Sequence, residues 1–158
     1  MSNIKRKLEG EIEIRVTAGD VYHEIYESKP HHVSHAAPHF VQSCDLHEGE
    51  LGKPGSVIVW KYKTAASGKP LIAKNIIEEI DKEKKLVRQR CIEGDLLDDY
   101  KTITGICQVI PKDSETSIVK WGFEYEKLHP GSPEPTALLD SLLAAAKDID
   151  DHHHGVKK

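Results

Sequence analysis

Residues Pro133 to Asp151 read Pro-Glu-Pro-Thr-Ala-Leu-Leu-Asp-Ser-Leu-Leu-Ala-Ala-Ala-Lys-Asp-Ile-Asp-Asp, and this stretch decides the fold. Thr136 can serve as the N-cap of a helix, because the prolines before it are tolerated only up to the first helical turn. Apolar residues then recur at three- and four-residue spacing, which predicts one long helix with a single apolar face. That face comprises Leu138, Leu139, Leu142, Leu143, Ala146 and Ile149.

The chain before this helix alternates between apolar and polar residues with period two, which is typical of half-buried β-strands. Turns rich in Gly, Pro, Asp and Lys separate the alternating segments, so most neighbouring strands are expected to pair in an antiparallel meander. Seven strands are predicted, at residues 4–16, 40–46, 56–64, 70–80, 86–93, 100–111 and 117–128.

Two short helices are predicted between the first two strands. The first begins near Thr17 or Asp20 and ends at Ser28, and its inner face comprises Val21 and Ile25 together with Tyr22 or Tyr26. The second covers residues 31–37 and ends before Pro38, since proline closes a helix.

This order of elements indicates an α+β protein. We expect a seven-stranded curved antiparallel sheet that wraps the long C-terminal helix, with the two short helices between strands 1 and 2. Residues 1–158 form one domain, as suits a chain of this length. The space between such a sheet and its helix is either a filled core or a cavity for one small ligand, and the periodicity leaves both open.

Composition argues against several classes of partner and compartment. The net charge is −4 and no face reads as a basic stripe, so nucleic acid is not an expected partner. No apolar run reaches the roughly 18 residues of a membrane span, and no apolar segment of a secretion signal follows the basic N-terminus. Cys44, Cys91 and Cys107 are odd in number and widely spaced, which indicates reduced thiols and a cytoplasmic location.

Several strings spread over nearly the whole chain carry a family resemblance. They include Lys-Leu-Glu-Gly-Glu-Ile-Glu at residues 7–13, Ile-Glu-Gly-Asp-Leu at 92–96 and Gln-Val-Ile-Pro-Lys at 108–112. The more specific strings are Gly-x-x-Gly-Lys-x-Gly-Ser at 49–56 and Trp-x-x-Glu-Tyr-Glu-Lys at 121–127. With these strings the chain resembles the major latex proteins, within the plant pathogenesis-related class 10 and birch-pollen-allergen superfamily, which has the START-like helix-grip fold.

The resemblance implies a cytosolic plant protein with a large internal hydrophobic cavity and a part in defence and stress responses. It implies a binding or carrier protein for small hydrophobic ligands such as sterols, cytokinins, fatty acids and flavonoids, with no cofactor. The alternative is an enzyme of specialised metabolism, because some relatives condense or isomerise alkaloid precursors with a Lys, a Tyr and a carboxylate in the same cavity. A weaker reading is a receptor-like protein whose partner is another protein. A monomer is expected, although the sequence leaves the oligomeric state open.

Aromatic residues on the inner faces of the third and seventh strands are the best candidates for ligand contact, because they give flat apolar walls and tyrosine adds a hydroxyl. The competing interpretation is that such residues only fill the core. The expected ligand-binding residues are Ile25, Trp60, Tyr62, Val87, Gln89, Ile103, Trp121, Phe123, Tyr125, Leu139, Leu142 and Ala146.

The three alanines at 144–146 are small residues on what is predicted to be the inner turn of the helix. Small side chains there would leave volume for a ligand. Replacing Ala145 or Ala146 by Leu is therefore predicted to weaken binding with little loss of stability.

Two further patterns suggest sites that the sequence does not support. Gly49 to Gly55 is glycine-rich, but Pro54 and a strand follow its lysine where a phosphate-binding loop needs Ser or Thr and a helix, so a tight turn with positive φ is expected. His31, His32, His35, His39 and residues 152–154 lack a Cys or carboxylate at metal-ligand spacing, and no metal site is predicted.

No ordered catalytic set is found either. The chain has no nucleophile elbow, no His-Glu-x-x-His and no dinucleotide fingerprint. Lys147 is the only lysine within the long helix and lies off its apolar face. The sequence therefore predicts no catalytic residues and no enzyme.

Overall fold

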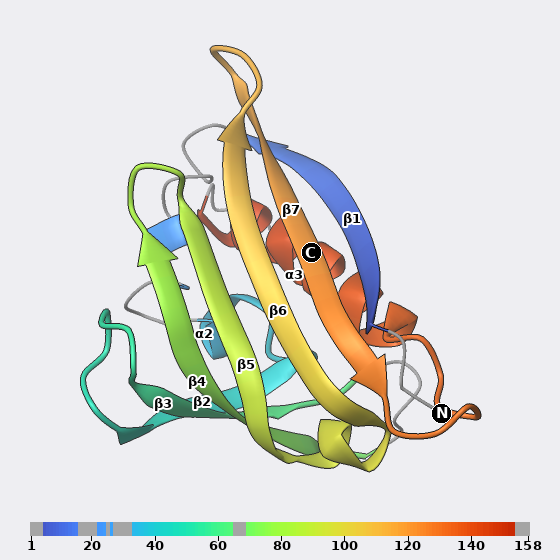
Figure 1. Cartoon of the computed structure of the whole chain (residues 1–158). Helices are drawn as coiled ribbons and strands as arrows, with labels where there is room; N and C mark the ends of the chain where they lie inside the picture. Colours follow the sequence, from blue (N-terminus) through green and yellow to red (C-terminus); the bar gives the residue numbers. More distant parts are fainter. Residues whose placement is uncertain (1–4, 16–21, 25, 27–32, 65–68, 154–158) are drawn as a thin grey trace.

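A computed structural model of the chain describes residues 5–15, 22–24, 26, 33–64 and 69–153. Seven strands form one curved sheet, and a long helix lies along its concave face (Figure 1). The predicted helix-grip fold is therefore confirmed. The elements are β1 (Lys5–Arg15), α2 (Val33–Ala36), β2 (Val41–Glu48), β3 (Val57–Tyr62), β4 (Leu71–Asp81), β5 (Leu86–Gly94), the 3₁₀ helix η2 (Asp95–Asp98), β6 (Tyr100–Pro111), β7 (Thr116–Lys127) and α3 (Thr136–His153).

The order of strands across the sheet is β1-β7-β6-β5-β4-β3-β2, and every neighbouring pair is antiparallel. Strands β2 to β7 form the predicted meander. Strand β1 departs from it, since β1 pairs along its whole length with β7, from Lys5 opposite Glu126 to Arg15 opposite Thr116. Two strands that are consecutive in sequence thus occupy opposite edges of the sheet.

The predicted short helices lie between these two edge strands. Residues 22–24 and 26 of the first are helical, and Tyr22 and Tyr26 are buried, whereas Val21 and Ile25 lie outside the described residues. The second is the single turn α2, at the end of which the N–H groups of Phe40 and Val41 donate to the carbonyl of Ala37.

The curvature of the sheet coincides with interruptions of its register. Shifts occur in the β4–β5 pair at Lys74/Asn75 and Ile77/Glu79, and two more lie in the β2–β3 pair. An extra residue in one strand bends it and increases its twist. The sheet therefore curls around α3 rather than lying flat beneath it.

Close packing of α3 on β1 depends on Gly10. A Cβ atom at this position would come within 3.0 Å of Cδ1 of Leu143 and 3.3 Å of Cδ2 of Leu139. Separations below about 3.4 Å are tighter than ordinary carbon contacts, so a side chain here would require these leucine side chains to shift. Glycine therefore lets the apolar face of α3 close this edge of the core.

Helix α3 starts one residue earlier than its predicted cap implies. The N–H of Leu139 donates to the carbonyl of Pro135 at 3.1 Å, so Thr136 is already helical and the N-cap position falls on Pro135. The core-facing residues are otherwise much as predicted: Leu139, Leu142, Ala146 and Ile149 are buried, and Leu138 and Leu143 are half-buried. Ala145 is also buried, but Ala144 is exposed and does not belong to the inner turn.

Candidate functional site

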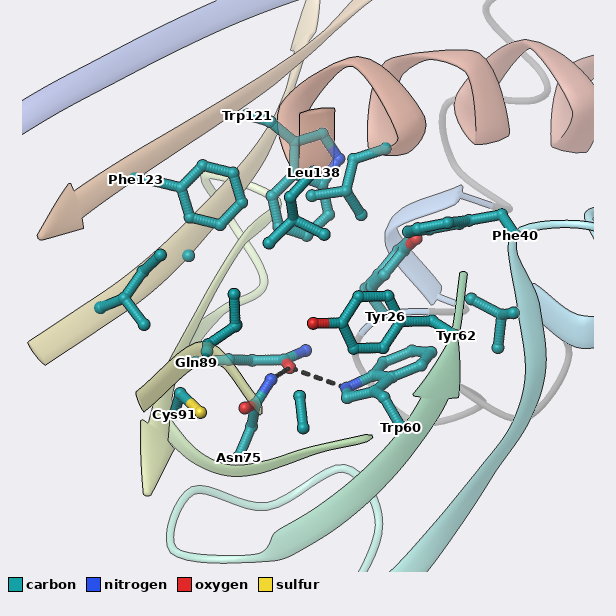
Figure 2. Close-up of a pocket in the computed structure, with 16 residues that line it drawn as sticks. Tyr26, Phe40, Trp60, Tyr62, Asn75, Gln89, Cys91, Trp121, Phe123 and Leu138 are labelled. Carbon is teal, nitrogen blue, oxygen red and sulfur yellow. Dashed lines mark hydrogen bonds between the residues drawn. The ribbon is translucent and has the colours of Figure 1, made fainter. Parts of the chain in front are cut away.

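A cavity lies between the concave face of the sheet and α3 (Figure 2). The centre of a water-sized sphere can occupy about 80 Å³ of it. A single water needs roughly 10–15 Å³ on this measure, so the space is several times larger than a packing defect. Periodicity had left a filled core and a cavity open, and the structure contains a cavity.

Seven of the twelve predicted ligand-binding residues line this cavity. They come from β3, β5, β6, β7 and α3, and each strand residue has the parity that directs it to the concave face. These residues are Trp60, Tyr62, Gln89, Ile103, Trp121, Phe123 and Leu142.

Four predicted residues are buried outside the lining, and Ile25 lies outside the described residues. Tyr125 has inward parity, but it packs edge-on against Tyr100 at 5.6 Å and donates its hydroxyl proton to Glu134, near the end of β7. Leu139 packs on β1 beside Gly10. Val87 and Ala146 belong to the surrounding core. These four residues are therefore inward-facing but lie away from the cavity.

Nine lining residues were absent from the predicted set. Two of them lie on predicted apolar faces and had already been considered as core: Leu138 on the long helix and Tyr26 on the first short helix. Cys91 shares the parity of Gln89 on β5, and Ala73 and Asn75 share a parity on β4, so extending the parity argument to β4 and β5 would have found them. The nine are Tyr26, Phe40, Val41, Ala73, Asn75, Cys91, Leu96, Gly105 and Leu138.

Aromatic rings form much of the cavity wall. The ring of Tyr26 lies 5.3 Å from that of Trp121 in an edge-on contact and 6.0 Å from that of Trp60. Trp121 in turn stacks on Phe123 at 6.4 Å. Such offset and edge-on pairs are the favoured geometries of aromatic side chains, and they present both ring faces and ring edges to the cavity.

Gly105 contributes to the volume by having no side chain. A Cβ atom there would lie 3.2 Å from Cε1 of Phe123 and 3.5 Å from Cζ3 of Trp121. Those rings therefore pack over the backbone of β6, and any larger residue at 105 would take up space in the cavity.

A small polar cluster interrupts the apolar wall. The indole Nε1 of Trp60 donates to Oε1 of Gln89 at 3.2 Å, and Nδ2 of Asn75 donates to the same oxygen at 3.1 Å (Figure 2). An indole N–H can only donate, so it fixes the carbonyl end of the Gln89 amide toward it. The second bond then fixes the orientation of Asn75.

Three buried polar atoms of cavity-lining residues have no hydrogen-bond partner among the described residues, namely Oδ1 of Asn75 and the hydroxyls of Tyr26 and Tyr62. Burial raises the pKa of Tyr62 well above its ordinary value, and the nearby Cys91 and Asp95 raise it further. The phenol is therefore neutral at any physiological pH and can both donate and accept a hydrogen bond.

Charged groups lie away from the cavity in the part of the chain that the structure describes. Its lining includes no Asp, Glu, Lys, Arg or His. Lys147 is on the outside of α3, 3.4 Å from Asp150 and 3.2 Å from Asp151. A lysine and carboxylate facing a bound substrate are thus not found among these lining residues.

Other motifs from the sequence fall outside the cavity. Gly49, Gly52 and Gly55 have φ values of 88°, 87° and 89°, which confirms the predicted tight connection with left-handed glycines. No group of three potential metal ligands converges among the residues that are described. His31, His32 and His154 lie outside that part of the chain. None of the described helices is long and apolar enough to cross a membrane.

The family model of the pathogenesis-related protein Bet v 1 family matches residues 3–154 of the chain. The chain belongs to this family. Among its relatives, MLP-like protein 43 of Arabidopsis thaliana is 41% identical over 152 residues, which cover 96% of this chain and 94% of that protein. The crystal structure of major latex-like protein 151 from Panax ginseng is 42% identical, with a TM-score of 0.88 over 94% of this chain and 97% of that one.

A more distant member of the same fold is the truncated norcoclaurine synthase of Thalictrum flavum. Its structure has a TM-score of 0.75 and 20% identity, and the match covers 99% of this chain and 98% of that one. At this identity the likeness shows the shared fold only. The fold thus includes an enzyme as well as the more similar major latex-like proteins.

Proposed function

We propose that this protein binds and carries a small hydrophobic molecule in the cavity between the sheet and α3. The observation that carries the proposal is a mostly apolar cavity, rich in aromatic side chains and with a few fixed polar groups, which is the usual form of a small-molecule site. Membership of a family whose members generally bind small hydrophobic ligands supports it. Sterols, cytokinins, fatty acids and flavonoids are the ligand classes proposed, in the setting of defence and stress responses.

The volume of the cavity favours some of these ligand classes over others. The cavity has room for one or two fused rings, roughly the volume of several waters. The purine of a cytokinin and the fused two-ring part of a flavonoid are of this scale, whereas the four fused rings of a sterol are larger. We therefore expect ring-containing ligands of the smaller classes to bind without rearrangement of the wall.

The test uses the two tryptophans of the chain, Trp60 and Trp121, both of which line the cavity. Titration with one member of each ligand class should change tryptophan emission, with calorimetry giving the affinity and stoichiometry. Native mass spectrometry of protein from plant tissue should show a bound small molecule. If no class changes the emission or releases heat, and the protein from tissue carries no ligand, the proposal is wrong.

We propose no catalytic role for this cavity. Its described lining offers tyrosine hydroxyls and amides but no lysine or carboxylate for proton transfer. Incubation with the dopamine and hydroxybenzaldehyde named with the norcoclaurine synthase structure should give no condensation product. Formation of a product, abolished by changes to lining residues, would revive the enzymatic alternative.

A cytoplasmic location and a monomeric state complete the proposal. Cys44, Cys91 and Cys107 are free thiols, which suits a reducing compartment. Light scattering after size exclusion should give the mass of one chain, and a fluorescent fusion should distribute through the cytosol. A dimer mass or a secreted fusion would contradict these two parts separately.

A further inference from the structure

Some polar atoms in the cavity wall have no hydrogen-bond partner among the described residues, while others are fully used. The indole of Trp60 has one N–H and no acceptor, so Oε1 of Gln89 must face it. The same oxygen also accepts from Nδ2 of Asn75. Because both amides are fixed in this way, Oδ1 of Asn75 faces elsewhere as an acceptor without a donor.

The hydroxyls of Tyr62 and Tyr26 are the other lining groups with unused hydrogen-bonding capacity, and Tyr62 belongs to the sheet, as Asn75 does. Tyr62 is 4% exposed, and its oxygen has no partner among the described residues. Burying a hydroxyl or amide oxygen without a hydrogen bond costs free energy, so such groups are rare in a core that serves only stability. A ligand hydroxyl or N–H supplies the donor that Asn75 lacks, and Tyr62 can donate to or accept from the same class of ligand.

The lack of charged side chains in the described lining limits the charge that a ligand can carry. No described lining residue carries a charge, so nothing there compensates a buried carboxylate, phosphate or ammonium group. Asp95 also raises the pKa of the Tyr62 hydroxyl, because its negative charge disfavours a second anion there. A charged head group is therefore excluded from the interior more strongly than a neutral one.

We infer that the cavity selects neutral ring compounds that present a hydroxyl or N–H donor to Asn75 and Tyr62, in preference to purely apolar rings and to carboxylates such as fatty acids. The inference rests on the proposed function, because it assigns the ligand class of the same cavity. Asn75 and Tyr62 are on this account specificity-determining residues, whereas the aromatic wall supplies affinity to any flat apolar ring.

Three two-ring probes of matched shape test the selection: 2-naphthol, 2-methylnaphthalene and 2-naphthoate. By calorimetry at pH 7 we expect 2-naphthol to bind more tightly than the methyl compound and more than about tenfold more tightly than the carboxylate. Tyr62→Phe should weaken 2-naphthol about fivefold, which is the effect of one neutral hydrogen bond, and leave 2-methylnaphthalene within about twofold.

The variant Tyr100→Phe is the matched control. Tyr100 is also a buried tyrosine, but its hydroxyl donates to the carbonyl of Pro133 at 2.5 Å, away from the cavity. Thermal unfolding of Tyr62→Phe should occur at the same or a higher temperature than in the original chain, because the hydroxyl that is removed has no partner. Tyr100→Phe should unfold at a lower temperature and keep the original probe preferences.

The remaining outcomes are distinct. If 2-methylnaphthalene binds as tightly as 2-naphthol, or if Tyr62→Phe weakens all probes equally, the selection is overturned while the proposed carrier function stands. If 2-naphthoate binds as tightly as 2-naphthol, the exclusion of charge is overturned. If none of the three probes binds, both the selection and the proposed function are overturned.

Discussion

The indole Nε1 of Trp121 donates to the hydroxyl of Tyr22 at 2.6 Å, which joins β7 to a helical segment 99 residues earlier in the chain. Tyr22 is fully buried and Trp121 is 5% exposed, so solvent does not compete for this bond. The ring of Tyr22 also lies 4.9 Å from that of Tyr26, a cavity-lining residue. This one hydrogen bond thus helps to hold a wall of the cavity against the sheet.

Removing the Tyr22 hydroxyl should destabilise the fold. In Tyr22→Phe the N–H of Trp121 loses its partner, and leaving a buried donor unsatisfied costs about 1–3 kcal/mol. Urea unfolding followed by circular dichroism should show this loss in the free energy of unfolding. Tyr62→Phe, which removes a hydroxyl that has no partner among the described residues, is the control and should cost nothing. Equal effects of the two changes would contradict the assignment.

Adding one methyl group at Gly105 should reduce the affinity for ring compounds. The Cβ atom of Gly105→Ala would enter the cavity beside Phe123, and 2-naphthol and 2-methylnaphthalene should both bind about two- to tenfold more weakly. Stability should change by no more than about 1 kcal/mol, since alanine is less flexible than glycine in the unfolded chain.

The matched control for this change is Gly122→Ala. Gly122 is on the other face of the sheet, where its Cβ would meet only Glu9 at 3.4 Å and the backbone of Leu8. Binding of both probes should be unaltered in this variant. A similar loss of affinity from both alanines would place the ligand somewhere other than the cavity.

Cys91 should report directly on occupancy of the cavity. Burial raises the pKa of the Cys91 thiol to about 11, although hydrogen bonds with the backbone at Glu93 and Lys74 lower it in part. At pH 7 the thiol is protonated and reacts slowly, because the thiolate is the nucleophile. Iodoacetamide labelling mapped by mass spectrometry should be slow at Cys91 and slower still with 2-naphthol bound. Cys44, which does not line the cavity, should show no ligand-specific protection.

Glu134, just before the start of α3, should make the free energy of unfolding depend on pH in the acid range. Glu134 accepts from Tyr125 and from Lys127 at 2.9 Å, and Arg6 lies 3.6 Å away, which lowers its pKa below the ordinary value of 4.5. Its contribution to stability is complete above pH 4.5 and is lost as the pH falls through the lowered folded-state pKa. Glu134→Gln should be less stable at pH 7 and lose less stability between pH 5 and pH 3. A parallel pH profile for the variant and the original chain would contradict this contribution.

Ala146→Leu should destabilise the core instead of acting on the ligand. Ala146 is fully buried and does not border the cavity, so the prediction from the sequence that leucine there weakens binding at little cost does not follow from its position. Overpacking a filled core costs about 1–3 kcal/mol. Ala144→Leu on the exposed side of α3 is the control and should leave the urea midpoint unchanged. A stable Ala146→Leu variant with reduced probe affinity would restore the earlier prediction.

Local patterns predicted the elements well because each depends on neighbouring residues. Alternation assigned Trp60, Tyr62, Trp121 and Phe123 to the concave face, and three- to four-residue spacing assigned Leu142 to the inner side of α3. These features follow from periods of 2 and 3.6 residues alone.

What the patterns could not supply is position along an element. Tyr125 has the same parity as Trp121 but contacts Tyr100 at the far end of β7, and the cavity does not extend that far. Asn75 follows a register shift on β4, and no local signal gives its distance from Gln89. Such facts depend on how far the sheet curls and where α3 crosses it, which are properties of the whole chain.

The pairing of β1 with β7 has a consequence for how the protein is made. Residues 5–15 find their partners at residues 116–126, so the first strand to leave the ribosome is among the last to be paired. Until then its apolar side chains have no sheet to pack on, and contacts between distant segments form slowly because a long loop must close first. Strands β2 to β7 can assemble as they emerge, whereas β1 can pair only after β7 has been made, and α3 follows β7 in the chain. The cavity therefore closes only after residues 116–153 have been synthesised, and a ligand present at that stage could be enclosed as the protein folds.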